Sequence, residues 1–364
     1  SCRSCPQGHG PGWCNGQCAW DATSNDCVDR PTNVHPMYHE IISLYAFQPV
    51  VDQTGEYVNI ICVRAPLRSD EEWRTYEKYK DELLFLGISS FETFPLSSPN
   101  PYSANFSNDL YVGMFPGFLH MERDPKGVFP PHVKTLLMSQ SDFFLPEMSN
   151  HEVESMKGMS KSFDFVFSGT DQDVDNGCVG WASFAKNWSF ALQALEVMCK
   201  PDFGLRGVLV ATVNKANTTS CPIPPSCEGT MVQTPFLDQG TFHSYLKRSR
   251  FAFLPQVYDA SPRVITQALA LNVPLLMNRN IRGGWKYLVP RITGEFFRDL
   301  SDFEVSLRRL LGQLDRNEYK PHQWTTERYG NKLAGARLLD FVRTNFGDRV
   351  DLPEGVTALI PTGA

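Results

Sequence analysis

The sequence predicts an α/β fold of two Rossmann-like domains, with a small Cys-rich disulfide module in front of them. Three observations carry this prediction. The chain has 364 residues, which is enough for two domains with cores of their own. Two stretches alternate short apolar strands with amphipathic helices, the pattern of parallel α/β sheets. Finally, five of the ten cysteines fall within the first 27 residues.

The predicted domain boundaries follow changes in composition along the chain. We expect a Cys-rich module at 1–30, a first α/β domain at 31–160 and a second α/β domain at 161–320. The remainder, 321–364, is expected to form a long amphipathic helix, Pro321–Phe346, and a tail that pack back on the first α/β domain.

The elements of both domains are predicted from hydrophobic periodicity. In the first domain we expect strands at Tyr57–Arg64, Val112–His120 and Val133–Met138 and a helix at Asp70–Leu86. In the second we expect strands at Asp164–Ser168, Gly207–Val213, Phe251–Pro255 and Val273–Met277, and helices at Phe184–Met198 and Pro262–Leu271. Short polar turns between these elements indicate a parallel, doubly wound sheet.

Charge and hydropathy exclude two classes of partner. The net charge is −6 and no run of Lys and Arg exceeds two residues, so nucleic acid is not the expected partner. No apolar stretch approaches the roughly 18 to 20 residues that would cross a bilayer, so no membrane segment is expected in this chain. Without an initiator Met or a signal-like segment, we expect a mature or truncated product.

Cysteine usage indicates an oxidising compartment. The module contains Cys2, Cys5, Cys14, Cys18 and Cys27, and the body contains Cys62, Cys178, Cys199, Cys221 and Cys227. The first spacings also resemble zinc-ligand spacings, but a disulfide-stapled module is the favoured interpretation. If all ten cysteines pair, an odd number of bridges must join module and body. Cys221 and Cys227 flank a proline-rich loop that they could close between themselves.

Three glycosylation sequons support the same compartment. They begin at Asn105, Asn187 and Asn217. Together with the cysteines they lead us to expect a glycoprotein of the secretory-pathway lumen, in the Golgi or the endoplasmic reticulum, or a secreted protein.

The most informative stretch runs from Phe251 to Met277. A buried strand is followed by a loop that carries Asp259 and by a helix, with Ser261 expected as the N-cap and Pro262 as the first helical residue. Asn272 can adopt the left-handed conformation that ends the helix.

A helix that starts at the carboxyl end of a parallel sheet is suited to phosphate binding. Its free N–H groups and the positive end of its dipole favour an anion. Arg263, in the first turn, would add a bidentate donor for the same anion. The stretch therefore predicts a phosphate site.

This stretch resembles the donor domain of GT-B glycosyltransferases, particularly the retaining group that includes sucrose and glycogen synthases. Those enzymes have two acids eight positions apart, of which the first contacts the sugar hydroxyls and the second the ribose. The corresponding residues here are Asp259 and Gln267. Aspartate is a shorter equivalent of glutamate, whereas Gln267 departs from the pattern but can still hydrogen-bond a ribose hydroxyl.

The resemblance extends from Phe163 to about Tyr319. Arg282, Gly283 and Gly284 resemble the glycine loop that cradles the sugar end of the donor. Ser168 and Gly169, with Lys186, resemble the glycine loop and basic residue that meet the diphosphate; the loop before Lys186 is longer than usual in that group.

The resemblance implies transfer of a sugar from a nucleoside-diphosphate sugar, such as a UDP- or GDP-sugar, to a protein or glycan acceptor, with retention and no required cofactor. Asp259 would orient the sugar, while Arg263, Lys186 and the helix N-terminus would stabilise charge on the diphosphate. The resemblance also implies that the two domains face each other across a cleft, as in the GT-B fold. The acceptor would bind the first domain, where His120 is either an acceptor-side residue or a buried core histidine.

An acidic loop leaves alternatives open. Asp171, Asp173 and Asp175 precede a glycine and form a solvated loop, a calcium site, or the metal site of a GT-A glycosyltransferase. The calcium interpretation lacks a bidentate glutamate, because Ala182 stands at that position. A non-catalytic carbohydrate-binding protein is a further alternative, since Gln267 departs from the catalytic pattern.

Overall fold

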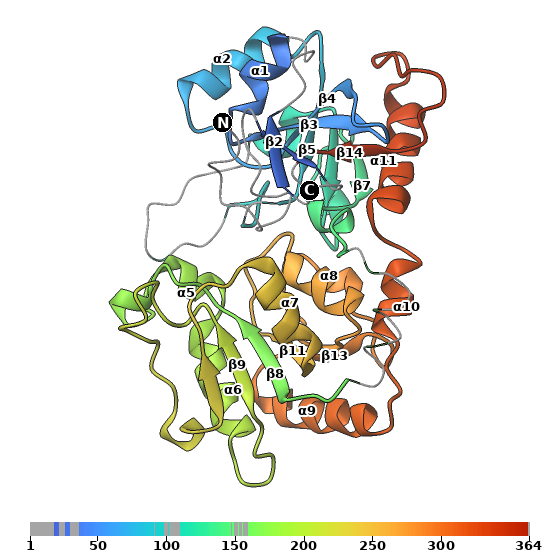
Figure 1. The fold of residues 1–364 in the computed structure, drawn as a ribbon. Coiled ribbons are helices and arrows are strands. Elements are labelled where there is room, and N and C mark those ends of the chain that lie inside the picture. The colour runs from blue at the N-terminus through green and yellow to red at the C-terminus, as the bar shows by residue number, and fades with distance from the viewer. Residues whose placement is uncertain are drawn as a thin grey trace. The chain divides into compact units, whose positions relative to one another are not determined.

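The structure is a computed structural model that describes residues 18–21, 26–29, 36–90, 92–97, 101, 110–146, 148, 152, 155 and 159–362. The chain divides into two compact units, each with its own sheet (Figure 1). Unit 1 comprises 1–98, 105–144 and 328–364, and unit 2 comprises 99–104 and 145–327. In the described part of the chain, no helix is both long and apolar enough to span a membrane.

The Cys-rich module is described only by the backbone of one antiparallel strand pair, β1 (Cys18–Asp21) and β2 (Asp26–Asp29). The predicted disulfides of Cys2, Cys5 and Cys14 lie outside the described residues, as do the side chains of Cys18 and Cys27.

Unit 1 contains a six-stranded sheet in the order β14-β3-β4-β5-β6-β7. Its strands are β3 (Phe47–Asp52), β4 (Tyr57–Val63), β5 (Leu84–Ile88), β6 (Gly117–His120), β7 (Lys134–Leu137) and β14 (Leu359–Pro361). Strands β4 to β7 are parallel, whereas β3 pairs antiparallel with both β4 and β14. Its helices are α1 (Pro36–Ile42), α2 (Asp70–Tyr79), α3 (Tyr111–Met114) and α11 (Asn331–Phe346). Helix α11, red in Figure 1, lies beside β14.

Two predicted boundaries in unit 1 are wrong. Helix α2 begins with a capping box at Ser69 but ends at Tyr79; residues 80–83 form a turn, and the last three residues of the expected helix begin β5 (Leu84–Ile88). Its five consecutive buried residues are those of a central strand rather than a half-buried helix. The strand expected at Val112–His120 is a short helix followed by β6, because Pro116 cannot continue the helix.

Unit 2 contains a sheet of six parallel strands in the order β10-β9-β8-β11-β12-β13. The strands are β8 (Phe163–Ser168), β9 (Gly207–Val210), β10 (Met231–Gln233), β11 (Ser249–Leu254), β12 (Leu275–Asn278) and β13 (Gly294–Phe297). In chain order this is 3-2-1-4-5-6, the strand order of the Rossmann fold.

Helices pack on both faces of this sheet. They are α5 (Trp181–Ala185), α6 (Trp188–Met198), α7 (Gln239–Lys247), α8 (Arg263–Ala270), α9 (Leu300–Asp315) and α10 (Pro321–Thr326). Phe165, Phe167 and Phe253 face the core that α6 and α9 complete, whereas α7 and α8 pack against β11. The predicted doubly wound arrangement is confirmed for unit 2.

Two predicted helices are interrupted. The helix expected at Phe184–Met198 is divided into α5 and α6 by Asn187, whose φ is 55°. The helix expected at Pro321–Phe346 is divided into α10 and α11, with Gly330 at a φ of 103° before the second part. In both places a residue with a positive φ turns the chain, although the apolar pattern continues through it.

The body cysteines correct two predictions. Cys178 is bridged to Cys221, and Cys199 to Cys227, so Cys221 and Cys227 do not close the loop between them. Cys62 forms no disulfide among the described residues; it lies fully buried on β4, where burial raises the pKa of its thiol to about 12. Cys62 is buried, and the other four body cysteines are paired with one another. Among the described residues, no body cysteine is therefore left for the expected bridge to the module.

Candidate functional site

The strand order of unit 2 reverses between β8 and β11, and the carboxyl ends of two such strands are where the ligand crevice of an open parallel sheet lies. These two strands are adjacent and parallel, with Phe167 opposite Phe253. After β8 the chain passes to α6 on one face, and after β11 it passes to α8 on the other. Ligands of open parallel sheets bind at such a switch point.

The N-terminus of α6 lies at this crevice. Asn187 is its N-cap residue, but no side chain caps the first turn. Instead, Asn187 Nδ2 donates a hydrogen bond to the carbonyl of Pro255, at the end of β11, over 2.9 Å. Asn278, at the end of β12, donates to the same carbonyl over 3.2 Å. These two amides fix the start of α6 and the end of β12 against the loop that follows β11.

The N-terminus of α8 also lies at the crevice, and its predicted cap is corrected. Pro262 is the N-cap residue rather than the first helical residue, and no side chain caps the helix. Ser261 is buried, and its backbone N–H donates to Asp259 Oδ1 over 3.2 Å, so Asp259 stabilises the loop through an Asx turn. The helix ends as predicted, with Asn272 at a φ of 58°.

An ion pair joins the residue before the N-cap of α6 to the loop that leads into α8. Lys186 Nζ lies 3.5 Å from Asp259 Oδ2, and the side chains are 29% and 20% exposed. Arg263 is the first residue of α8 and is half-buried. Gln267 follows one turn later on the same helix and is buried. Two uncapped helix N-termini and two cations therefore offer an anion several donors.

Glycines let the neighbouring loop approach closely. A Cβ on Gly283 would lie 1.9 Å from the carbonyl oxygen of Ala260, and Gly284 has a φ of 77°. The Gly283 N–H donates to the Asp259 carbonyl over 2.8 Å, and the Arg282 N–H to the Val257 carbonyl over 2.9 Å. The predicted glycine loop is thus bonded to the loop that carries Asp259.

The loop after β8 is also closely packed. Ser168 is the last residue of β8, and a Cβ on Gly169 would lie 3.1 Å from the carbonyl oxygen of Val210. Beside it is a cavity of about 10 Å³, room for a single water molecule. Lys186 and Trp188 line this cavity, and the buried Trp188 Nε1 has no hydrogen-bond partner in the described structure.

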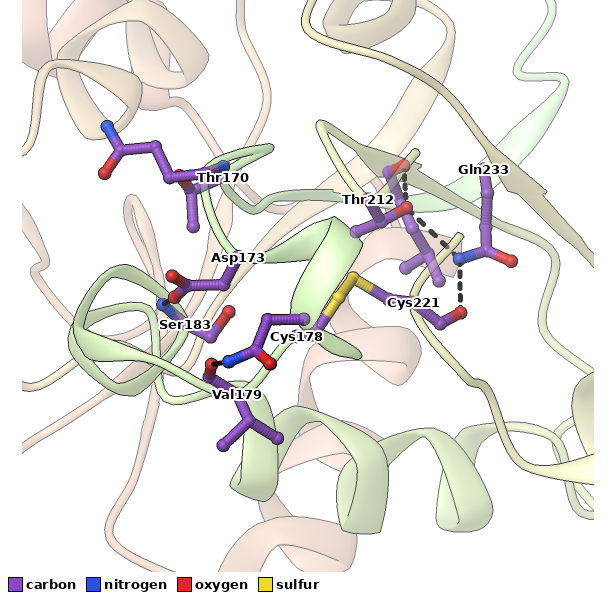
Figure 2. The surroundings of a disulfide bond; sticks show 11 residues. Thr170, Asp173, Cys178, Val179, Ser183, Thr212, Cys221 and Gln233 are labelled. Carbon is purple, nitrogen blue, oxygen red and sulfur yellow. Dashed lines mark hydrogen bonds between the residues drawn. A yellow bond between two sulfur atoms is a disulfide. The ribbon is translucent and has the colours of Figure 1, made fainter. Parts of the chain in front are cut away.

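A disulfide joins the loops on either side of this cavity (Figure 2). Cys178 follows β8 and Cys221 follows β9, and Cys221 itself lines the cavity. Gln233 Nε2 donates to the Cys221 carbonyl over 2.9 Å and to Thr212 Oγ1 over 3.3 Å. The disulfide therefore fixes the loop of β8 to that of β9.

The acidic loop has structural partners. Asp173 Oδ2 accepts the N–H of Ser183 over 2.7 Å, which stabilises the start of α5 (Figure 2). Asp175 Oδ1 accepts from Asn214 Nδ2 over 2.7 Å. Among the described residues, no three His, Cys, Asp or Glu side chains gather in a metal-binding group, and Asp171 joins none. These bonds favour a structural role for Asp173 and Asp175 over the alternative metal sites.

His120 lies in unit 1 and is 3% exposed. Its Nδ1 accepts the backbone N–H of Glu122 over 3.1 Å, and its ring lies 5.6 Å from that of Phe129. This environment is that of a buried core histidine, so the acceptor-side interpretation is not supported.

The sequons differ in accessibility, and Asn105 lies outside the described residues. Asn217 is exposed in a turn, whereas Asn187 is half-buried with its amide bonded to Pro255. In protein from a secretory host, we expect a glycan at Asn217 and none at Asn187, because glycosylation would modify the nitrogen that holds α6. Mass spectrometry of glycopeptides checks this; a glycan at Asn187 would show that this bond is dispensable.

Sequence analysis missed three structural supports of the site. The interruption before α6, the bond from Asn278 and the disulfide between the two loops were not predicted. A polar residue at the end of a buried strand, such as Asn278, is the one signal that could have indicated a role at the sheet edge.

Comparison with known proteins identifies the fold. No protein-family model and no curated protein matches the sequence. Sucrose-phosphate synthase from Thermosynechococcus elongatus is 9% identical, with a TM-score of 0.52 over 76% of this chain and 72% of that chain. A crystal structure of TarM is 10% identical, with a TM-score of 0.51 over 71% of this chain and 50% of that chain.

These likenesses confirm the GT-B fold that the sequence resemblance predicted. The match extends over only half the length of TarM. Since a GT-A enzyme has a different fold, the GT-A alternative is wrong at the level of architecture.

Proposed function

We propose that this chain is a glycosyltransferase that moves a sugar from a nucleoside-diphosphate sugar to a protein or glycan acceptor. One observation carries the proposal. The uncapped N-termini of α6 and α8 lie at the switch point of a Rossmann sheet, where Lys186 pairs with Asp259 in the loop that leads to Arg263, the first residue of α8. A diphosphate is the anion best suited to two adjacent helix N-termini and two cations.

The proposed reaction proceeds with retention. The bond from the sugar's anomeric carbon to the diphosphate breaks, and an acceptor hydroxyl forms the new glycosidic bond on the same face. Its proton passes to an oxygen of the leaving phosphate. Lys186, Arg263 and the helix N-termini stabilise the charge that grows on the diphosphate, and Asp259 orients the sugar.

We further propose that the protein acts in the secretory-pathway lumen or outside the cell. The two disulfides of unit 2 and the exposed sequon at Asn217 support an oxidising compartment with glycosylation machinery.

The test is donor turnover. A panel of UDP- and GDP-sugars is incubated with the protein, without and with candidate acceptors, and release of the nucleoside diphosphate is measured. We expect release from at least one donor, faster with its acceptor, and unchanged by EDTA if Asp173 and Asp175 are structural. Arg263→Ala should lower the rate. Arg206→Ala, an exposed arginine before β9 at the other end of the sheet, is the matched control.

The outcomes separate the alternatives. Nucleotide binding without turnover of any donor would favour a non-catalytic carbohydrate-binding protein, in line with glutamine at position 267. Activity lost in EDTA and restored by manganese would show that a metal takes part after all.

A further inference from the structure

Three aromatic side chains lie together in the segments that follow β8 and β11 in unit 2. Trp181 and Phe184 are on α5, which follows β8, and Tyr258 is in the loop after β11. The rings of Phe184 and Tyr258 are stacked, with centroids 5.1 Å apart and planes at 16°. The ring of Trp181 lies 5.7 Å from that of Phe184. All three side chains are part-exposed.

These rings are next to the charged pair of the proposed donor site. Tyr258 directly precedes Asp259, and Phe184 lies two positions before Lys186. The carboxylate and the ammonium of that pair are 3.5 Å apart. One ligand can therefore meet aromatic carbon and paired polar groups at the same place.

A pyranose ring has this combination of surfaces. Its C–H groups present a weakly positive, apolar face that suits the negative face of an aromatic ring. Its hydroxyls need polar partners at the rim, which a carboxylate and an ammonium supply.

We propose that Trp181, Phe184 and Tyr258, here called the aromatic platform, present an exposed ring face that stacks against the apolar face of a pyranose ring, whose hydroxyls reach Asp259 and Lys186. The proposal rests on the proposed function, since it assigns the sugar end of the same site. The ring belongs either to the donor sugar or to the acceptor, because both carry this chemistry.

Position argues against a nucleobase on the platform. In a nucleoside-diphosphate sugar, the base and the sugar lie at opposite ends of the diphosphate. The platform adjoins Asp259, the residue assigned to the sugar, whereas Gln267, assigned to the ribose, lies one turn into α8. The platform is therefore at the sugar end.

The experiment compares Trp181→Ala and Tyr258→Ala with wild type. Dissociation constants of UDP or GDP, and of the nucleotide sugar that wild type turns over fastest, are measured by calorimetry, and the acceptor KM by initial rates. Tyr258→Phe keeps the stack and should restore wild-type values. Tyr245→Ala removes a half-buried ring that pairs with Phe163 at the other end of the sheet, and it is the matched control.

We expect the alanine variants to bind the nucleoside diphosphate as wild type does and to weaken sugar recognition about fivefold or more, the size of one aromatic stacking contact. If only the affinity for the nucleotide sugar falls, the platform binds the donor sugar. If only the acceptor KM rises, the platform binds the acceptor.

Three results would overturn the proposal. An equal loss of affinity for the nucleoside diphosphate and for the nucleotide sugar would mean that the platform contacts the nucleotide. Unchanged donor affinity and unchanged acceptor KM would leave the rings a purely structural role. If wild type binds no nucleoside diphosphate, the proposed function fails and the platform assignment fails with it.

Discussion

Replacing Asp259 with asparagine should lower the turnover number about tenfold or more, which corresponds to 1.4 kcal/mol in the activation barrier. The free nucleoside diphosphate should bind at least as tightly as before. Asparagine keeps an oxygen that can accept the Ser261 N–H, so the Asx turn is retained, but it removes the charge assigned to the sugar. It also breaks the ion pair with Lys186, so that the ammonium group of Lys186 can interact with the phosphates.

Comparison with Asp259→Ala separates the two roles of this carboxylate. Alanine removes the charge and the turn, so it should lower turnover at least as much and also reduce the melting temperature. Asp171→Asn, the same change in the neighbouring acidic loop, should leave turnover unchanged. Normal turnover in Asp259→Asn would make Asp259 only a turn residue, and the alignment with the GT-B donor motif would then be wrong.

Removing the bridge between Cys178 and Cys221 should cost both stability and diphosphate affinity. The cysteines are 43 residues apart, and closing a loop of that length is worth about 4 kcal/mol in the chain-entropy account. For a unit of this size the melting temperature should fall by about 10 °C. Diphosphate binding should weaken because Cys221 lines the cavity beside Gly169 and Lys186.

The second disulfide provides the matched control. Cys199 and Cys227 are 28 residues apart and lie in the hydrophobic core. Its double alanine variant should lose nearly as much stability, about 3.5 kcal/mol. Its diphosphate affinity, measured well below the melting temperature, should remain that of wild type. If both double variants bind the diphosphate as tightly as wild type, the first disulfide does not support the site.

The sequence predicted the β11–α8–β12 stretch best. Its signals are local, since Pro262 and Asn272 act through their own backbone conformations. The cap of α8 was nevertheless assigned to the wrong residue. The Ser261 N–H is bonded to Asp259 in an Asx turn, and Pro262 is the N-cap residue. Which residue caps the helix depends on the conformation of the whole loop and not on the capping preference of a single residue.

What could not be predicted depends on contacts between distant residues. The apolar pattern runs through the division between α5 and α6, and Asn187 forms its bond with Pro255, 68 positions away. Cysteine spacing likewise does not specify pairing, so the short loop between Cys221 and Cys227 suggested a bridge that the fold does not make. Local signals indicated the candidate site, and tertiary contacts determine its shape.

The most direct test of the central claim, that a nucleoside diphosphate binds at the switch point of unit 2, is calorimetric titration of UDP and GDP. We predict that wild type and Arg206→Ala bind at least one of them with equal affinity. Arg263→Ala should bind it more weakly by about 1.5 to 3 kcal/mol, the contribution of a charge-assisted hydrogen bond. Failure of wild type to bind either nucleotide, or undiminished binding by Arg263→Ala, would contradict the account.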